Sequence, residues 1–298
     1  MRILITGGTG LIGRALCTAL APAGHDVTVL SREPATVAKK CGPKVTAMGS
    51  LRQWDDTRTF DAIINLAGAP IIDAGWTKAR KKVIWDSRVT LTEKVVERIA
   101  LARQKPAVLL SGSAIGYYGD QGDRELDESA KPADDFPSQL CVGWEQAAEK
   151  ASKLGVRVCL LRTGLVLARD GGMLAQMRTP FSLGLGTRLG GGGQWMSWIH
   201  IDDYVAIVLR LLEDTQVDGP VNMTAPKPVT NREFTASLAK ALRRPAIFVA
   251  PAWLLKAALG PRAILLLGSE RVLPKRIEEA GYSFRYADLR SALQNLLG

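Results

Sequence analysis

Hydrophobic and polar positions follow two different periods along the first half of the chain. Short runs rich in β-branched residues predict buried strands, and the segments between them have the spacing of amphipathic helices. Because helices separate the strands, we expect an α/β fold with a doubly wound parallel sheet covered by helices on both faces. The predicted strands are 2–6, 26–30, 62–66, 107–111 and 156–162, and the predicted helices are 11–23, 78–102 and 139–154.

A glycine-rich segment at 184–193 interrupts this pattern, and the chain is mainly helical from Thr230 onward. The freedom of a glycine backbone suits either a lid over a ligand or a plain connector. We therefore predict two domains. The first comprises residues 1–165 with a return segment at about 195–225, and the smaller, mainly helical second domain comprises residues 166–194 and 226–298.

The composition is that of a globular protein with a substantial core, since 47% of the 298 residues are hydrophobic and 23% are charged. A formal net charge of +10 suits an anionic ligand, a nucleic acid or an acidic membrane surface. The basic residues are scattered, apart from a short concentration at 78–82, and no nucleic-acid recognition element is identifiable. We expect no nucleic-acid partner, because that interpretation would depend on charge alone.

Cysteine and histidine are too few and too poorly spaced for a zinc site, so we predict no structural metal. The N-terminus lacks the apolar stretch of a secretory signal. Charged residues or proline, such as Arg162 and Pro251, interrupt the longer apolar runs. We therefore expect a reduced, cytoplasmic protein that does not enter a membrane, present as a monomer or homodimer.

Three glycines with G-x-x-G-x-x-G spacing stand where the first predicted strand ends and the first predicted helix begins. Glycine permits a tight turn there and lets backbone N–H groups approach a pyrophosphate, at which the helix directs its positive end. The alternative is a strand-to-helix turn without a ligand. The predicted dinucleotide-binding residues of this turn are Gly7, Gly10, Leu11, Ile12 and Gly13.

The end of the second predicted strand bears on the choice of dinucleotide. A fold that prefers NAD usually offers a carboxylate to the ribose 2′-hydroxyl at this point, whereas this chain offers Ser31 and Arg32. The Arg32 guanidinium would favour a 2′-phosphate, so we predict NADP as the cofactor. The alternatives are that Glu33 binds the ribose instead, or that Arg32 is an ordinary surface residue.

Further motifs follow in order: Asn-Leu-Ala-Gly at 65–68, Ser-Gly-Ser to Tyr-Gly at 111–119, 162–167, and Trp-Ile-His-Ile-Asp-Asp at 198–203. With the glycine turn they resemble the extended short-chain dehydrogenase/reductase superfamily. Ser-Arg at 87–88, Trp-Glu at 144–145 and Pro-Phe at 180–181 resemble its atypical epimerase-family branch. Its members have the Rossmann fold, bind NAD or NADP and include nucleotide-sugar epimerases. The resemblance implies that Leu66, Ala67 and Gly68 lie near the adenosine ribose and that Leu165 helps to cover the nicotinamide.

The catalytic pattern departs from the superfamily, which generally uses a Tyr-x-x-x-Lys pair whose lysine lowers the tyrosine pKa. None of the five tyrosines has a lysine four residues further on. The expected pair falls on Cys141 and Glu145, or on Leu140 and Trp144 if the register shifts by one residue. A carboxylate at 145 cannot supply the electrostatic role of lysine.

Three other side chains are candidates for the site. The resemblance places Ser113 where it would hydrogen-bond a substrate oxygen, and Tyr117 is the candidate proton donor, although both residues would also fit a purely structural role. Arg88 should lie on a helix beside the cofactor cleft, where it would pair with a phosphate or a substrate carboxylate. The alternative for Arg88 is an ion pair on the helix surface with Asp86 or Glu93.

Together these features predict an NADP-binding protein of the extended short-chain dehydrogenase/reductase type. We expect an oxidoreductase or a nucleotide-sugar epimerase-like enzyme that transfers a hydride at nicotinamide C4 but lacks the usual Tyr-x-x-x-Lys pair. Its substrate would be an anionic small molecule or a sugar nucleotide. The alternative is a noncatalytic NADP-binding sensor or regulatory protein, which the missing pair supports directly.

Overall fold

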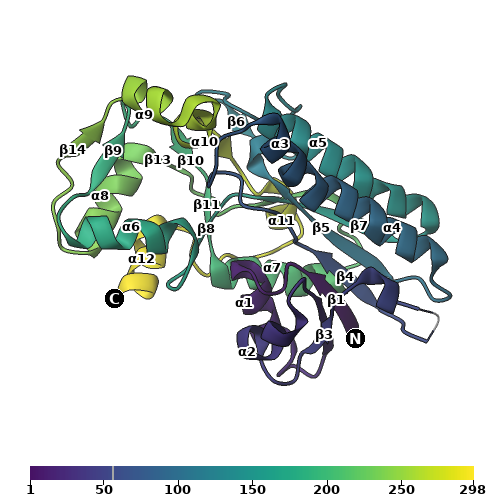
Figure 1. The fold of residues 1–298 in the computed structure, drawn as a ribbon. Coiled ribbons are helices and arrows are strands. Elements are labelled where there is room, and N and C mark those ends of the chain that lie inside the picture. The colour runs from purple at the N-terminus through teal and green to yellow at the C-terminus, as the bar shows by residue number, and fades with distance from the viewer. Residues whose placement is uncertain (56) are drawn as a thin grey trace.

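The structure is a computed structural model that describes residues 1–55 and 57–298. A seven-stranded parallel sheet with the order β12-β7-β5-β4-β1-β2-β3 forms its centre (Figure 1). The chain progresses outward in one direction from β1 to β3 and in the other from β4 to β12, so the predicted doubly wound sheet is confirmed. The strands are β1 (Arg2–Thr6), β2 (Asp26–Leu30), β3 (Thr46–Met48), β4 (Ala62–Asn65), β5 (Val108–Ala114), β7 (Arg157–Thr163) and β12 (Gly219–Met223).

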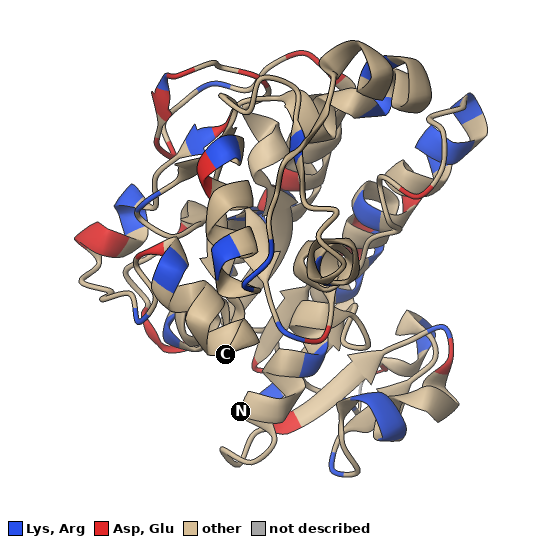
Figure 2. Ribbon diagram, turned by 90° about the vertical axis from the view of Figure 1, so that its left-hand side faces the viewer, with Lys and Arg blue, Asp and Glu red and all other residues tan. Residues whose placement is uncertain are grey.

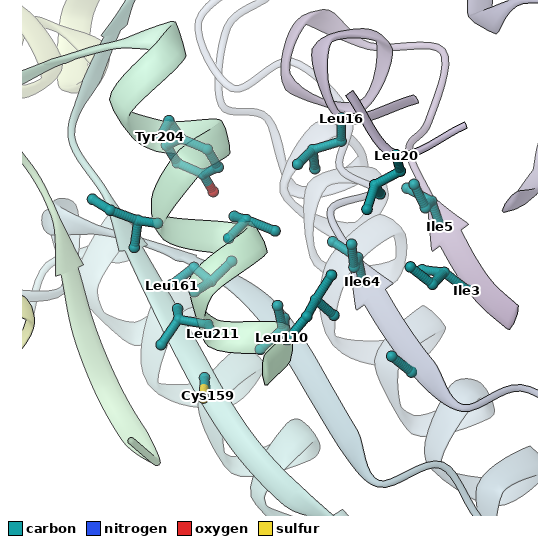
Figure 3. Packing of buried hydrophobic residues seen from close by; sticks show 14 of the residues in the cluster. Ile3, Ile5, Leu16, Leu20, Ile64, Leu110, Cys159, Leu161, Tyr204 and Leu211 are labelled. Atoms are coloured by element: carbon teal, nitrogen blue, oxygen red, sulfur yellow. The ribbon is translucent and has the colours of Figure 1, made fainter. Parts of the chain in front are cut away.

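Helices cover both faces of this sheet because alternate residues of its strands point to opposite sides. On one face, Ile3 and Ile5 pack with Leu16 and Leu20 (Figure 3), whereas their neighbour Leu4 belongs to the core on the other face. The helices of the first face are α1 (Leu11–Leu20), α2 (Val37–Cys41) and α7 (Ile201–Glu213), and those of the second face are α3 (Lys78–Trp85), α4 (Leu91–Leu101) and α5 (Phe136–Glu149).

All three predicted helices differ from their observed form. Helix α1 ends at Leu20, three residues before the predicted end at 23. The predicted helix 78–102 consists of α3 and α4 joined by a π-helical turn, Asp86–Thr90, which displaces the side chains of this turn from the regular helical spacing. Helix α5 begins three residues before the predicted start at 139. The earlier start arises because the Asp135 carboxylate accepts a hydrogen bond from the Ser138 backbone N–H (2.9 Å), which caps the helix.

The second half of the chain supplies a region of short two-stranded sheets and a helical C-terminal part (Figure 1). Its core contains Trp198, Phe234 and Leu293. The strand pairs are β8 (Leu165–Leu167) with β11 (Trp198–His200), β9 (Thr187–Leu189) with β14 (Phe248–Ala250), β10 (Trp195–Met196) with β13 (Val229–Thr230), and β6 (Glu125–Leu126) with β15 (Arg271–Val272). The helices are α6 (Gly172–Ser182), α8 (Asn231–Ala241), α9 (Ala252–Leu259), α10 (Ile264–Leu267), α11 (Lys275–Glu279) and α12 (Leu289–Leu297).

The glycine-rich segment 184–193 takes part in this second region through its central strand. Residues Thr187–Leu189 form β9, and the Gly190 backbone N–H donates to the Ala250 carbonyl oxygen at 2.8 Å. Lys and Arg are spread over many elements and interspersed with acidic residues (Figure 2). Among the described helices, none combines the length and the apolar character needed to cross a bilayer.

Candidate functional site

The glycine turn, residues 7–13, connects β1 to α1 at the carboxyl edge of the sheet. Gly7 has a φ of 71°, and a Cβ there would lie 2.8 Å from the Ala67 backbone nitrogen. A Cβ at Gly13 would lie 2.4 Å from the Gly7 carbonyl oxygen. Glycine at 7 therefore lets the turn pack against the segment that follows β4, and glycine at 13 lets the turn close on itself.

The start of α1 remains available for an anion. Gly10 is the N-cap residue, so no side chain caps the helix, and its first turn contains no acidic residue. The first backbone N–H groups, including those of Leu11 and Ile12, have no intrahelical acceptor. The end of β1 that precedes this turn is tied to β4 and the segment after it, because Thr6 Oγ1 donates to Asn65 Oδ1 (2.7 Å) and accepts from the Ala67 backbone N–H (3.1 Å). A helix start of this kind, with free N–H groups and no acidic side chain, is able to bind an anion.

Arg88 lies in the π-helical turn and points at the segment after β4. Its Nη1 donates to the Ala69 carbonyl oxygen at 2.9 Å. A Cβ at Gly68 would lie 2.8 Å from Arg88 Cζ and 2.9 Å from Nη2, so only the missing side chain of Gly68 allows this approach. Among the described residues, none accepts a hydrogen bond from Nε or Nη2 of Arg88. The forked edge of the guanidinium is thus free for a bidentate anion.

The structure contains neither of the two ion pairs considered as alternatives for Arg88. The Asp86 carboxylate binds Lys82 Nζ at 2.7 Å, and the Glu93 carboxylate binds Lys150 Nζ at 3.0 Å. Within the described part of the chain, no carboxylate lies within 4.0 Å of the Arg88 guanidinium. Burial lowers the pKa of Arg88, and the nearby charge of Arg80 lowers it further. Arg88 is therefore a half-buried cation without a counter-ion.

Ser31 and Arg32 follow β2 directly. The Ser31 hydroxyl accepts a hydrogen bond from the Glu33 backbone N–H at 3.1 Å, so it stabilises the turn. Arg32 is exposed and forms no ion pair with any described residue, whereas the Glu33 carboxylate reaches Lys40 Nζ at 4.0 Å. Of Ser31, Arg32 and Glu33, Arg32 is the charged residue without an ion-pair partner among the described residues.

A buried network, consisting of Ser113, Glu145, Arg162, Tyr118 and Asn222, lies further along the same edge. Ser113 Oγ donates to Glu145 Oε1 at 2.6 Å, and Arg162 binds both oxygens of Glu145, with Nε 2.8 Å from Oε1 and Nη2 2.9 Å from Oε2. Ser113 on β5 and Arg162 on β7 are partners in the sheet register. The three residues are no more than 5% exposed, so the ion pair is shielded from water.

Arg162 uses its remaining donors inside the protein as well. Its Nη1 donates to the Tyr118 hydroxyl (2.9 Å) and to the Glu128 carbonyl oxygen (3.1 Å), and Tyr118 donates in turn to Asn222 Oδ1 (2.7 Å). Burial opposes the charge of Arg162, but the hydrogen bonds and charge of Glu145 outweigh it and hold the pKa of Arg162 above its ordinary value. The network therefore satisfies its own charges without a ligand.

Two other side chains of this region, Tyr117 and Cys141, have raised pKa values. Arg162 Cζ lies 3.6 Å from the centre of the Tyr117 ring, yet burial raises the pKa of Tyr117 and the charge of Glu145 adds to this effect. Burial also raises the pKa of Cys141 to about 12, so its thiol stays neutral.

The partnership of Glu145 with Arg162 is the functional feature that sequence reasoning missed. The available signal was Arg162 itself, a charge within an otherwise apolar strand, because a buried arginine needs a carboxylate. Leu165, predicted to cover the nicotinamide, begins β8 just beyond β7, where its backbone N–H donates to the Ser197 carbonyl oxygen at 2.8 Å. The structure thus brings the residues predicted to bind the cofactor and those predicted to contact the substrate to one edge of the sheet.

Comparison with known proteins identifies the family. Residues 3–223 match the model of the NAD dependent epimerase/dehydratase family. The chain belongs to this family. Residues 250–296 match a domain of unknown function, DUF1731. The resemblance to the epimerase-family branch is therefore confirmed, and so is the α/β fold that it implied.

The similar proteins extend this result over the whole chain. The epimerase family protein Mb2239 of Mycobacterium bovis is 40% identical over 294 residues, which cover 98% of this chain and 96% of that protein. The crystal structure of the human epimerase family protein SDR39U1 (isoform 2) with NADPH has a TM-score of 0.90 and 34% identity, covering 100% and 99% of the two chains. The predicted cofactor, NADP, is present in that structure in its reduced form.

A third similar protein is the nucleoside-diphosphate sugar epimerase of Corynebacterium glutamicum. Its structure has a TM-score of 0.77 and is 34% identical in sequence. The match covers 100% of this chain and 58% of that one. The same fold therefore occurs within a longer protein.

Proposed function

We propose that this member of the epimerase family binds NADP and is an oxidoreductase or a nucleotide-sugar epimerase-like enzyme. The observation that carries the proposal is the free fork of Arg88 against Gly68, beside the uncapped start of α1. A half-buried cation without a counter-ion is costly unless a ligand neutralises it. A dinucleotide diphosphate would supply the missing negative charge.

The residues of this edge fit the cofactor. Gly7, Gly10 and Gly13 allow the close backbone packing of the turn. The N–H groups of Leu11 and Ile12 would bind the diphosphate. Arg32, with Ser31 beside it, would bind the 2′-phosphate.

Leu66, Ala67 and Gly68 would contact the adenosine ribose, and Leu165 would cover the nicotinamide. The NADPH in the human relative supports this choice of cofactor. When bound, the cofactor supplies hydride transfer at nicotinamide C4.

The buried network limits what Ser113 can do for a substrate. Its only hydroxyl proton is directed at Glu145, so its oxygen would accept a hydrogen bond from the substrate rather than donate one. Tyr117, whose raised pKa keeps its hydroxyl protonated, would donate. We infer a small-molecule substrate, either an anion or a sugar nucleotide, and the Corynebacterium relative supports the second.

We propose the following organisation for this activity. Residues 1–165 and the return segment at about 195–225 would bind the cofactor, and residues 166–194 and 226–298 would bind the substrate. The protein would act as a monomer or homodimer. Its four cysteines are free and buried, which fits a reducing cytoplasmic compartment.

A noncatalytic NADP sensor is the second candidate, and the buried network favours it. Glu145 stands where the superfamily resemblance expects the lysine of its Tyr-x-x-x-Lys pair, and Arg162 neutralises its charge. A sensor would bind NADPH, turn over none of a broad panel of carbonyl and sugar-nucleotide compounds, and bind a partner in a cofactor-dependent manner.

Titration of the purified protein with NADPH and NADH, followed by intrinsic fluorescence, tests the proposal. We expect NADPH to bind about tenfold more tightly than NADH, since one charge-assisted contact contributes about 1.4 kcal/mol. Oxidation of bound NADPH by the compound panel then separates an enzyme from a sensor. Absence of binding by either nucleotide would refute both candidates.

A further inference from the structure

Glu270 lies directly before β15, and its backbone is held firmly in place. The Glu270 N–H donates to the Trp195 carbonyl oxygen (3.2 Å), and its carbonyl oxygen accepts a hydrogen bond from Ser197 Oγ (2.7 Å). The neighbouring Val272 carbonyl oxygen accepts from Thr224 Oγ1 (3.4 Å), just beyond the end of β12. The segment that carries Glu270 therefore runs along the carboxyl edge of the main sheet.

The Glu270 side chain approaches the end of β5. Gly116 belongs to a 3-10 turn, Ile115–Tyr117, that follows β5 and contains the candidate donor Tyr117. A Cβ at Gly116 would lie 4.0 Å from Glu270 Oε1 and 3.4 Å from Pro137 Cβ. Glu270 is thus brought close to the turn that follows β5, the strand that carries Ser113, although Glu270 and Ser113 are 157 positions apart in the sequence.

The Glu270 carboxyl group has no partner within the described part of the chain, in either a hydrogen bond or an ion pair. Its charged neighbours are already engaged. The Asp120 carboxylate accepts from the backbone N–H groups of Gly122 and Ser269, and the Asp135 carboxylate caps α5. Arg271 pairs with Glu125 at 2.9 Å instead.

This environment determines the protonation of Glu270. The group is half-buried, and burial, followed by the charges of Asp135 and Asp120, raises the pKa of its carboxyl to about 8. Near neutral pH the side chain is therefore mainly a neutral carboxylic acid, which can donate a proton. Tyr117 and Cys141, by contrast, both have pKa values raised above their already higher ordinary values.

We propose that Glu270 is the catalytic acid that delivers a proton to the oxygen of a carbonyl substrate held at the end of β5. This inference rests on the proposed function as an NADP-dependent oxidoreductase. The carbonyl carbon accepts a hydride from the reduced nicotinamide, and the π electrons of the C=O bond form a new O–H bond with the proton of Glu270. The Glu270 carboxylate left behind takes up a proton from water, and the reverse sequence oxidises the alcohol.

Infrared difference spectra of the protein and its Glu270→Gln variant test the protonation state without any turnover. We expect a protonated carboxyl signal in the wild-type protein at pH 7 that is lost with a midpoint at about pH 8. The matched control is Glu213→Gln, an exposed glutamate at the end of α7. A Glu270 carboxyl that is already ionised below pH 6 would overturn the proposal, because no proton would be available.

Single-turnover oxidation of bound NADPH by phenanthrenequinone, a general dicarbonyl probe, tests proton delivery. We expect Glu270→Gln to lower the rate about a hundredfold, to abolish the decline of the rate above about pH 8, and to leave NADPH affinity unchanged. A variant as fast as the wild type, or a wild type that binds NADPH but does not reduce the probe, would overturn the role of Glu270. Failure to bind NADPH would instead refute the proposed function itself.

Discussion

The glycine turn with Arg88 and the buried network lie on the same sheet edge, but they use polar groups in opposite ways. At the glycine turn, the first N–H groups of α1 have no intrahelical acceptor, and Arg88 has no carboxylate among the described residues. In the buried network, Arg162 donates to Glu145, Tyr118 and a backbone carbonyl. The first arrangement is incomplete without an anion, whereas the second is complete by itself. An arginine therefore does not by itself mark a binding site. Whether its guanidinium already has partners inside the protein decides whether it is available to a ligand.

Removing the cation of the buried network should have the largest effect. Arg162→Met leaves the Glu145 carboxylate buried without its partner, so we expect the free energy of unfolding to fall by about 3–5 kcal/mol. Urea denaturation measures the loss, with the exposed Arg103→Met as the matched control. The double variant Arg162→Met with Glu145→Leu should lose less than the sum of the two single changes. A loss below about 1 kcal/mol for Arg162→Met would contradict the description of this network as a desolvated ion pair.

Closing the glycine turn should abolish cofactor binding. In Gly13→Ala the new methyl group meets the Gly7 carbonyl oxygen at 2.4 Å, so the turn must shift and NADPH affinity should fall at least about a hundredfold, or about 2.8 kcal/mol. Isothermal titration calorimetry gives the affinity. Gly75→Ala is the control, because nothing lies within 4 Å of a Cβ at Gly75. Unchanged NADPH binding in Gly13→Ala would show that this turn does not hold the diphosphate.

The substitution Arg88→Met sharpens the comparison between the two arginines. We expect NADPH affinity to fall about tenfold to a hundredfold because charge-assisted hydrogen bonds are lost, while stability is retained because no carboxylate loses its partner. Calorimetry and urea denaturation are both needed, with the exposed Lys78→Met on α3 as the control. If Arg88→Met destabilised the protein as strongly as Arg162→Met, the contrast between the two sites would be lost.

The smallest effect is expected at the end of β2. Arg32→Ala should weaken NADPH binding about tenfold and leave NADH binding unchanged, because NADPH alone carries the 2′-phosphate. Parallel titrations with both nucleotides measure this preference, and Lys39→Ala on α2 is the exposed control. Equal weakening for the two nucleotides would assign Arg32 to a part of the cofactor that they share.

Some elements could be predicted because their determinants are close together in the sequence. The glycine turn joins a strand and a helix that are adjacent along the chain, and the Cβ clash at Gly13 arises from atoms six residues away. The start of α5 was misplaced because Asp135, its N-cap, precedes the apolar pattern used to predict the helix. The π-helical turn was missed for a similar reason, since residue spacing alone does not reveal one inserted residue.

The amino-acid sequence by itself determined the doubly wound sheet, the family and the position of the glycine turn, because periodicity and short motifs act over neighbouring residues. Only the tertiary structure decided which charges are neutralised. Glu145 on α5 meets Arg162 on β7, Arg88 meets no carboxylate among the described residues, and Glu270 reaches the end of β5. The energy of a charge depends on groups within a few ångströms and on exclusion of water, and folding brings such groups together from distant parts of the chain.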